Sequence, residues 1–265
     1  MRLLFSISGL TVLLALTGCI TEFYPKTGES QSLLVVQALL TDQPEKNVVK
    51  LSRSHSLELK EKSLPLEGCR VIIDDNNENS YELEETEPGT YVTDPDFFRG
   101  MTGYIYTLRI YEMNAGETVR SYESIPMEMK PVPPVDTIWY EKVVMPENDI
   151  SGTPVEGCRV YLRTVDPEGL CSYFRWDFTE TWEIRIPYDV DNNKCWITRK
   201  STSINVRNTS ILTDNIITRQ LVNFVSNETD RLGVRYSMLV NQYSLSEDEF
   251  SYWERLQNVG EELGS

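Results

Sequence analysis

The sequence is poor in the side chains that most often carry catalysis or bind metals. Its 265 residues include one histidine, His55, and five cysteines. A Ser-His or Cys-His catalytic device would have to use His55, which we interpret as a residue of a polar loop or strand edge. There is no C-x-x-C pair, G-x-S-x-G elbow, P-loop, G-x-G-x-x-G or H-E-x-x-H motif. These absences disfavour an enzyme, and we expect no metal and no cofactor.

Basic residues and long apolar runs are also scarce. The chain has 25 Lys and Arg against 41 Asp and Glu, which gives a formal net charge of −16. An acidic surface repels nucleic-acid phosphates and anionic lipid headgroups, so nucleic acid is not an expected partner. The one long apolar run, at residues 3–18, is too short to span a bilayer as a permanent helix.

The N-terminus has the pattern of a lipoprotein signal. Arg2 precedes the apolar run, and the run ends in Leu16-Thr17-Gly18-Cys19, with small residues directly before a cysteine. We therefore predict a signal peptide at 1–18, a lipid on Cys19 and a tether at 19–32. The alternative is an ordinary secretory signal followed by a chance cysteine.

The rest of the chain consists of short runs rich in β-branched and aromatic residues, separated by turn signals. The segment 126–135 contains four prolines, which favours a linker between domains. We predict a mainly β protein with two successive Ig-like β-sandwiches, at 33–125 and 136–265. One C-terminal helix is expected after the capping box Ser246-Glu247-Asp248-Glu249.

The pentapeptide EGCRV occurs twice, at 67–71 and 156–160. Strand alternation places Cys69 and Cys158 on the apolar face of a strand entered through a glycine, so we interpret the copies as equivalent strands or as coincidence. Asp166-Pro167-Glu168-Gly169 predicts a type I turn within a hairpin. For a disulfide we favour Cys171–Cys195, and otherwise expect buried thiols.

Aromatic residues are concentrated in the second half, and alternation predicts that most of them form core. Trp182 and Tyr188 flank the charged run Glu183–Arg185 and an acidic turn, so they are the candidate ligand-binding residues. The acidic stretches 74–78 and 189–193 contain oxygen ligands suited to calcium, but we interpret both as solvated turns.

Several segments together resemble a known family. They are LTGCITEFYP, LLVVQALLTD, VVKLSRS, EGCRVIIDDN, EPGTYVTD, RWDFTETWEI and YSMLVNQYSLSEDEFSYWERL. Over about Thr21 to the end, the chain resembles the Bacteroidota lipoproteins catalogued as domain of unknown function 4249. The resemblance implies an outer-membrane lipoprotein, often encoded beside TonB-dependent transporters and their surface binding proteins, with no established catalytic residue. Asp136-Thr137-Ile138 also resembles the O-glycosylation sequon of these bacteria, which makes Thr137 a candidate site.

We therefore expect a lipoprotein of the cell envelope, anchored in the outer membrane through Cys19, on its surface or its periplasmic side. The expected function is that of a non-enzymatic accessory or binding component of TonB-dependent nutrient uptake. Its expected partners are the transporter or the transporter's surface lipoprotein. A surface assembly or adhesion module is the alternative, and a hydrolase is the third possibility.

Overall fold

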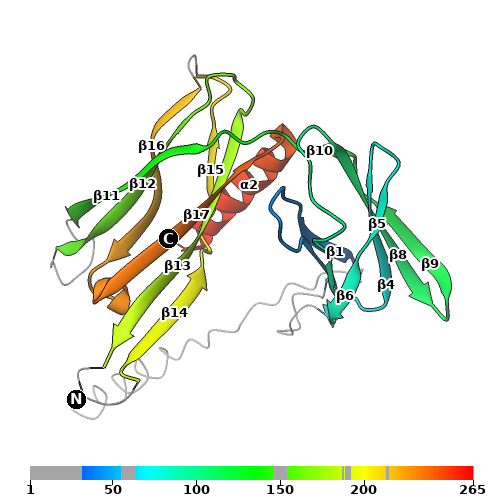
Figure 1. Ribbon diagram of the computed structural model, residues 1–265, viewed down its shortest axis with the longest axis horizontal. Coiled ribbons are helices and arrows are strands. Elements are labelled where there is room, and N and C mark those ends of the chain that lie inside the picture. The colour runs from blue at the N-terminus through cyan, green and yellow to red at the C-terminus, as the bar shows by residue number, and fades with distance from the viewer. Residues whose placement is uncertain are drawn as a thin grey trace, which may run out of the picture. The chain divides into compact units, whose positions relative to one another are not determined.

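The computed structural model describes residues 32–54, 64–145, 154–186, 188, 192–212 and 215–264. Antiparallel strands dominate, and the chain ends in one helix, α2 (Glu247–Gly264), which confirms the mainly β class (Figure 1). None of the helices in these ranges is both long and apolar enough to cross a membrane. The predicted signal peptide, Cys19 and His55 lie outside the described residues.

The chain divides into two compact units. Unit 1 comprises the described parts of Met1–Gly100 and Thr107–Ile125, and unit 2 those of Met101–Tyr106 and Pro126–Ser265. The proline-rich segment thus belongs to unit 2, and is held there by side chains of the last strand. Gln242 Nε2 donates to the Pro133 carbonyl at 2.6 Å, and Ser244 Oγ donates to the Lys130 carbonyl at 2.9 Å.

Unit 1 is built from two antiparallel sheets. The strands of the first are β1 (Leu34–Leu39), β2 (Val48–Arg53), β7 (Thr90–Val92) and β6 (Glu84–Glu87), with β3 (Leu64–Pro65) on β2. The second contains β8 (Ile105–Asn114), β4 (Cys69–Asp75) and β5 (Ser80–Glu82), with β9 (Glu117–Glu123) on β8. The first two residues of β8, Ile105 and Tyr106, belong to unit 2. The core of unit 1 lies between the two sheets. It contains the buried side chains of Val49 and Leu51 from the first sheet and of Val71 and Ile73 from the second.

Unit 2 is a two-sheet sandwich. One sheet has the order β11 (Val135–Met145), β12 (Val155–Val165), β16 (Ile216–Ser226). In the other, the long β13 (Tyr173–Arg185) pairs along one edge with β17 (Arg235–Ser244) and along the other with β14 (Lys194–Lys200) and β15 (Asn205–Asn208). The short η2 (Asp230–Leu232) precedes β17, and β10 (Met127–Glu128) pairs with Ile105 and Tyr106.

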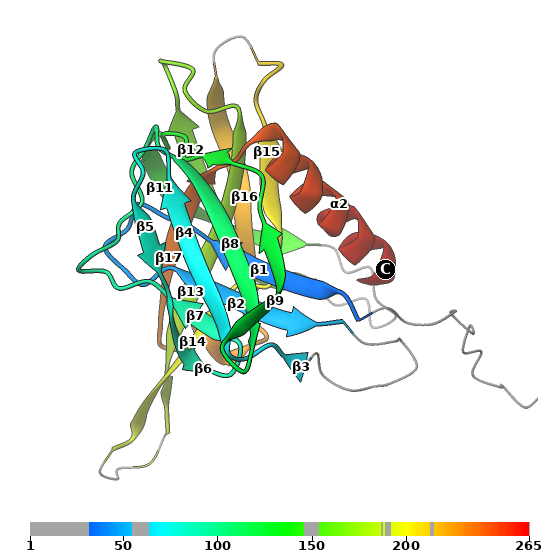
Figure 2. The ribbon, with the colours of Figure 1, turned by 90° about the vertical axis from the view of Figure 1, so that its right-hand side faces the viewer.

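The core of unit 2 follows from the alternation along β13. Phe174, Trp176 and Phe178 point to one face and are buried against Leu162 and Val222 of the facing sheet. Residues Tyr173 and Arg175 point to the opposite face, where helix α2 packs beside β15 (Figure 2). The alternating side chains of β13 therefore pack into the core on one face and contact helix α2 on the other.

The predicted capping box of α2 is confirmed. Ser246 N donates to Glu249 Oε2 at 2.7 Å, and Glu249 N donates to Ser246 Oγ at 3.2 Å. These reciprocal bonds satisfy backbone donors that the first helical turn leaves unpaired.

The predicted hairpin at Asp166–Gly169 is wrong, although the turn itself forms. Gly169 N donates to the Asp166 carbonyl at 3.2 Å, and the buried Asp166 carboxylate accepts from Cys171 N at 2.8 Å. The strands on either side, β12 and β13, lie in different sheets. The turn therefore carries the chain across the sandwich, because each strand has an apolar face to bury on the shared core.

The two EGCRV copies are not equivalent steps. Gly68 precedes β4 with φ +68°, and a Cβ there would meet nothing within 4 Å. Gly157 lies inside β12, and a Cβ there would lie 2.4 Å from the Val225 carbonyl oxygen and 2.6 Å from the Phe224 ring. The first glycine supplies a left-handed turn and the second supplies space. Cys69 and Cys158 are half-buried in both copies.

Candidate functional site

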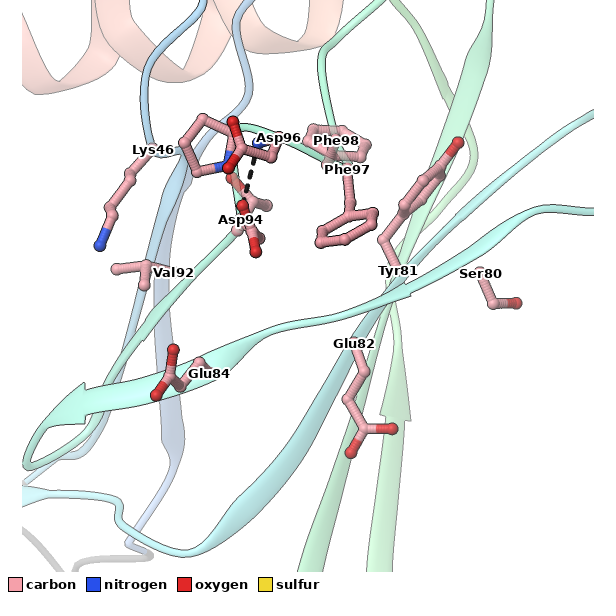
Figure 3. A pocket seen from close by; sticks show the side chains of 12 residues that line it. Lys46, Ser80, Tyr81, Glu82, Glu84, Val92, Asp94, Asp96, Phe97 and Phe98 are labelled. Carbon is pink, nitrogen blue, oxygen red and sulfur yellow. Dashed lines mark hydrogen bonds between the residues drawn. The ribbon is translucent and has the colours of Figure 1, made fainter.

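Unit 1 contains a groove of about 600 Å³ that is open to solvent (Figure 3). Its walls are β5, β6, the end of β7 and the turn that follows β7, with Lys46 at one side. In the view of Figure 3, Lys46, Asp94 and Asp96 lie on one side of the groove and Tyr81 on the other, with Phe97 between them.

The aromatic part of the groove is positioned by a turn that begins at Asp94. The Asp94 carbonyl accepts from Phe97 N at 3.1 Å and Phe98 N at 2.8 Å, while its Oδ1 accepts from Asp96 N at 2.9 Å. This turn sends the two consecutive phenylalanines in opposite directions. Phe98 is 3% exposed and packs edge-to-face on Tyr81 at 4.7 Å, whereas Phe97 is 80% exposed.

The groove is acidic. Glu82, Glu84, Asp94 and Asp96 line it together with a single cationic side chain, Lys46. An exposed aromatic ring offers a flat apolar surface to a ligand, and carboxylates accept hydrogen bonds from hydroxyl or ammonium groups. The arrangement therefore suits a ligand that is rich in hydroxyls or positively charged and has an apolar face.

A second charged cluster lies between the sheets of unit 2. The carboxylate of Glu180, which is 8% exposed, accepts from Arg231 Nη1 at 3.3 Å and from the Tyr236 hydroxyl at 3.0 Å. Burial, with the Glu180 hydrogen bond and charge, raises the pKa of Tyr236 far above its usual range. The Glu180 charge is thus paired, and its contacts join β13, η2 and β17.

Of the two predicted ligand-binding residues, Trp182 is buried. It is 1% exposed and lies on the core face of β13, four residues after Phe178. The Arg199 guanidinium lies over its ring, 5.3 Å from the ring centre. Burial removes it as a surface platform, so this prediction is wrong. Tyr188 is 70% exposed, and its role as a ligand contact stays a prediction.

The predicted Cys171–Cys195 disulfide is also wrong, because both thiols are free. Cys171 lies just before β13, whereas Cys195 pairs with Ile184 near the other end of that strand. The eleven residue-to-residue steps from Tyr173 to Ile184 span about 36 Å along the strand, far beyond the reach of a disulfide. Burial raises the pKa of the Cys171 thiol to about 11, and Cys195 is exposed.

The acidic stretch 74–78 behaves as the solvated turn that we expected. Asp75 Oδ1 accepts from Asn77 N at 2.8 Å and from Asn79 N at 3.0 Å. Burial acts to raise the pKa of Asp75, but these hydrogen bonds outweigh it and the pKa is lowered. Among the described residues, no three His, Cys, Asp or Glu side chains are grouped to hold a metal ion. Residues 189–191 of the other stretch lie outside the description.

Thr137, the candidate glycosylation site, is exposed on β11, where its hydroxyl donates to Asp136 Oδ2 at 3.2 Å. The site therefore lies in a strand, after the proline-rich segment. Its modification stays a prediction.

Sequence reasoning missed the groove. Its local signal is Asp94-Pro95-Asp96-Phe97-Phe98, a turn followed directly by two aromatic residues. Within such a tight turn consecutive side chains point in different directions, so one ring can be buried while its neighbour is exposed. That signal indicates an exposed ring but not the strands that surround it.

Comparison with known proteins gives one family and no named relative. The family model described as Domain of unknown function (DUF4249) matches residues 20–265. No curated protein matches the chain.

Proposed function

We propose, from the premise that this chain belongs to the DUF4249 family, that it is a lipid-anchored binding protein of the cell envelope. The anchor is the lipid on Cys19, placed there by the pattern Leu16-Thr17-Gly18-Cys19. In this proposal the protein is a non-enzymatic accessory of a TonB-dependent transporter in the outer membrane. The family resemblance supports the setting, and the groove of unit 1 supports the binding role.

The exposed ring of Phe97 carries the binding part of the proposal. It is 80% exposed beside four carboxylates, although Phe98 next to it is buried. Leaving a phenylalanine in water forgoes about 2 kcal/mol of burial, which a bound ligand with an apolar face would recover. The neighbouring carboxylates would accept hydrogen bonds from its hydroxyl or ammonium groups. We therefore propose neutral oligosaccharides or short basic peptides as the ligand class.

Calorimetric titration of the purified chain with panels of both ligand types tests the binding role. We expect at least one panel to bind without being converted, and Phe97→Ala to weaken that binding tenfold or more. Val119→Ala is the matched control, because Val119 is 59% exposed on β9 and does not line the groove. Turnover of a ligand, or equal losses in both variants, would contradict the proposed role of the groove.

The accessory role is tested separately, by mild detergent extraction and affinity purification through a C-terminal tag. We expect a TonB-dependent transporter or its surface lipoprotein to copurify. If the protein is recovered alone under conditions that preserve a known transporter complex, a surface assembly module becomes the better account.

A further inference from the structure

Strand β11 forms one edge of its sheet in unit 2. The sheet order is β11-β12-β16, and no other strand of the described residues pairs with β11 (Figure 1). The strand has 11 residues, and those whose peptide groups point away from β12 offer unpaired N–H and C=O groups along its outer side. Such an edge is able to accept another strand.

The side chains on one face of β11 are apolar and exposed. Ile138 and Tyr140 lie opposite Leu162 and Val160 of β12, so they share the face that forms the core. Leu162 and Val160 are 0% and 8% exposed, but Ile138 and Tyr140 are 47% and 65% exposed. The apolar row of the core therefore continues across β12 onto β11 and is uncovered there.

On the other face, a row of stacked side chains ends at the same edge. The Arg219 guanidinium lies 4.3 Å from the centre of the Tyr161 ring, and the Tyr161 ring stacks on Trp139 at 5.7 Å. Glu141 joins the two ends of the row, since it accepts from Trp139 Nε1 at 3.1 Å and Arg219 Nη2 at 2.6 Å. Because Tyr161 of β12 stacks on one face of the indole, the other face is on the side away from β12.

We propose that β11 pairs antiparallel with β11 of a second copy of this chain, about a twofold axis at Trp139. In this register the two Trp139 rings are neighbours, Ile138 of each copy lies opposite Tyr140 of the other, and Thr137 lies opposite Glu141. The stacked row then continues across the axis, and the two uncovered apolar rows meet. Twofold dimers are the commonest homo-oligomers, and in them both copies use the same surface, as they do here.

The charges of β11 select this register among its neighbours. Moving the axis to Tyr140 places Lys142 opposite Ile138, and moving it to Glu141 places the two Glu141 carboxylates opposite each other. Moving it to Ile138 places Asp136 opposite Tyr140. Only the axis at Trp139 pairs apolar with apolar side chains without like charges facing each other, which cross-strand pairing requires.

The net charge of −16 opposes association of two copies outside this contact. Salt screens that repulsion, because the Debye length falls from about 10 Å at 0.1 M to about 3 Å at 1 M. The register also sets the exposed Asp136 of each copy opposite Lys142 of the other, but exposed ion pairs contribute little. Pairing through backbone groups and apolar side chains should therefore strengthen as salt is added. An interface that depended on ion pairs would weaken.

Sedimentation of the full chain in detergent, over a range of concentrations, tests the pairing. We expect reversible dimers that become more stable with added salt, and a tenfold or greater weakening in Tyr140→Lys. Leu239→Lys is the control, because Leu239 is 66% exposed on another edge strand, β17. A wild-type chain that stays monomeric, or equal losses in both variants, would overturn the proposal.

Cysteine cross-linking in membranes tests the register, in a chain whose exposed Cys195 is replaced by serine. Trp139→Cys should cross-link to itself, because facing Cα atoms lie about 4.5 to 5.5 Å apart. Thr137→Cys should not, since its two copies would be four residues, or about 13 Å, apart along the strands. A chain that carries both Ile138→Cys and Tyr140→Cys should also cross-link to its partner copy, because position 138 of each copy lies opposite position 140 of the other. This variant keeps Trp139. Cross-linking at 137 alone, or at none of these positions, would overturn the register.

Discussion

Two glycines at the same position of a repeated sequence motif have different structural roles in this chain. Gly68 and Gly157 occupy the same place in the repeated pentapeptide, yet only Gly68 has a positive φ. Gly157 is extended and lies under the Phe224 ring. For Gly68 the reason for glycine is the backbone conformation, and for Gly157 it is the missing side chain.

Alanine substitution at these two positions should therefore cost different amounts. We expect Gly157→Ala to destabilise unit 2 by about 3 kcal/mol, because the new Cβ would clash with backbone that cannot move cheaply. Gly68→Ala should cost about 1 kcal/mol, the strain of a left-handed residue with open space around it. Denaturant midpoints of the two variants measure both effects. A larger loss for Gly68→Ala would show that the close approach at Gly157 relaxes.

At the scale of elements, helix α2 is held on β13 by aromatic contacts. The Arg175 guanidinium lies between the Tyr243 and Trp253 rings, 4.5 and 4.6 Å from their centres, and Phe250 contacts Tyr173 at 5.2 Å. The Arg175 side chain is only 12% exposed, and its charge is also paired with Asp177 at 3.4 Å. A desolvated cation between two rings attracts both of them, which joins the helix to the sheet.

Removal of either side of this contact should loosen the helix. We expect Arg175→Ala and Trp253→Ala each to destabilise the packing of α2 by about 2 kcal/mol. The double variant should lose less than the sum, because both changes remove the same contact. Hydrogen exchange of the α2 amides measures the effect, with Arg235→Ala as the control, since Arg235 is exposed at the start of β17, opposite Glu183 near the far end of β13. Fully additive losses would contradict direct coupling.

At the scale of the whole molecule, charge and anchor act together. A surface of net charge −16 is repelled by anionic headgroups, so the folded units have no electrostatic reason to dock on a membrane. Attachment then depends on the lipid that the proposal places on Cys19. Lipid chains hold a protein to a bilayer in proportion to the methylene groups that they bury.

Replacement of Cys19 should therefore change the location of the protein and leave its fold intact. We expect Cys19→Ala to remain as unprocessed precursor or to leave the membrane fraction, as followed by fractionation and mass spectrometry of the N-terminus. Cys195→Ser is the matched control, because it removes an exposed thiol far along the chain and should not alter the location. A processed Cys19→Ala chain that stays with membranes would contradict the lipid anchor.

The sequence by itself determined what depends on neighbouring residues. The alternation of Phe174, Trp176 and Phe178 sets which side of β13 is apolar, and the spacing of Ser246 and Glu249 sets where α2 begins. Both follow from backbone geometry over a few residues, so they could be read before any fold was known. The lipoprotein pattern at Cys19 is local in the same sense.

Only the tertiary structure decided which strands share a sheet and which side chains meet. The turn at Asp166–Gly169 is compatible with a hairpin or a crossing, and the facing sheet selects the crossing. The charged run beside Trp182 suggested an exposed ring, but β13 stays paired with β14 and β17 as far as this residue, so Trp182 continues the inward row of Phe174, Trp176 and Phe178. The groove joins Lys46, Tyr81 and Phe97 from separate segments. Contacts between residues far apart in the chain are selected by burying the most apolar surface overall, which no short segment specifies.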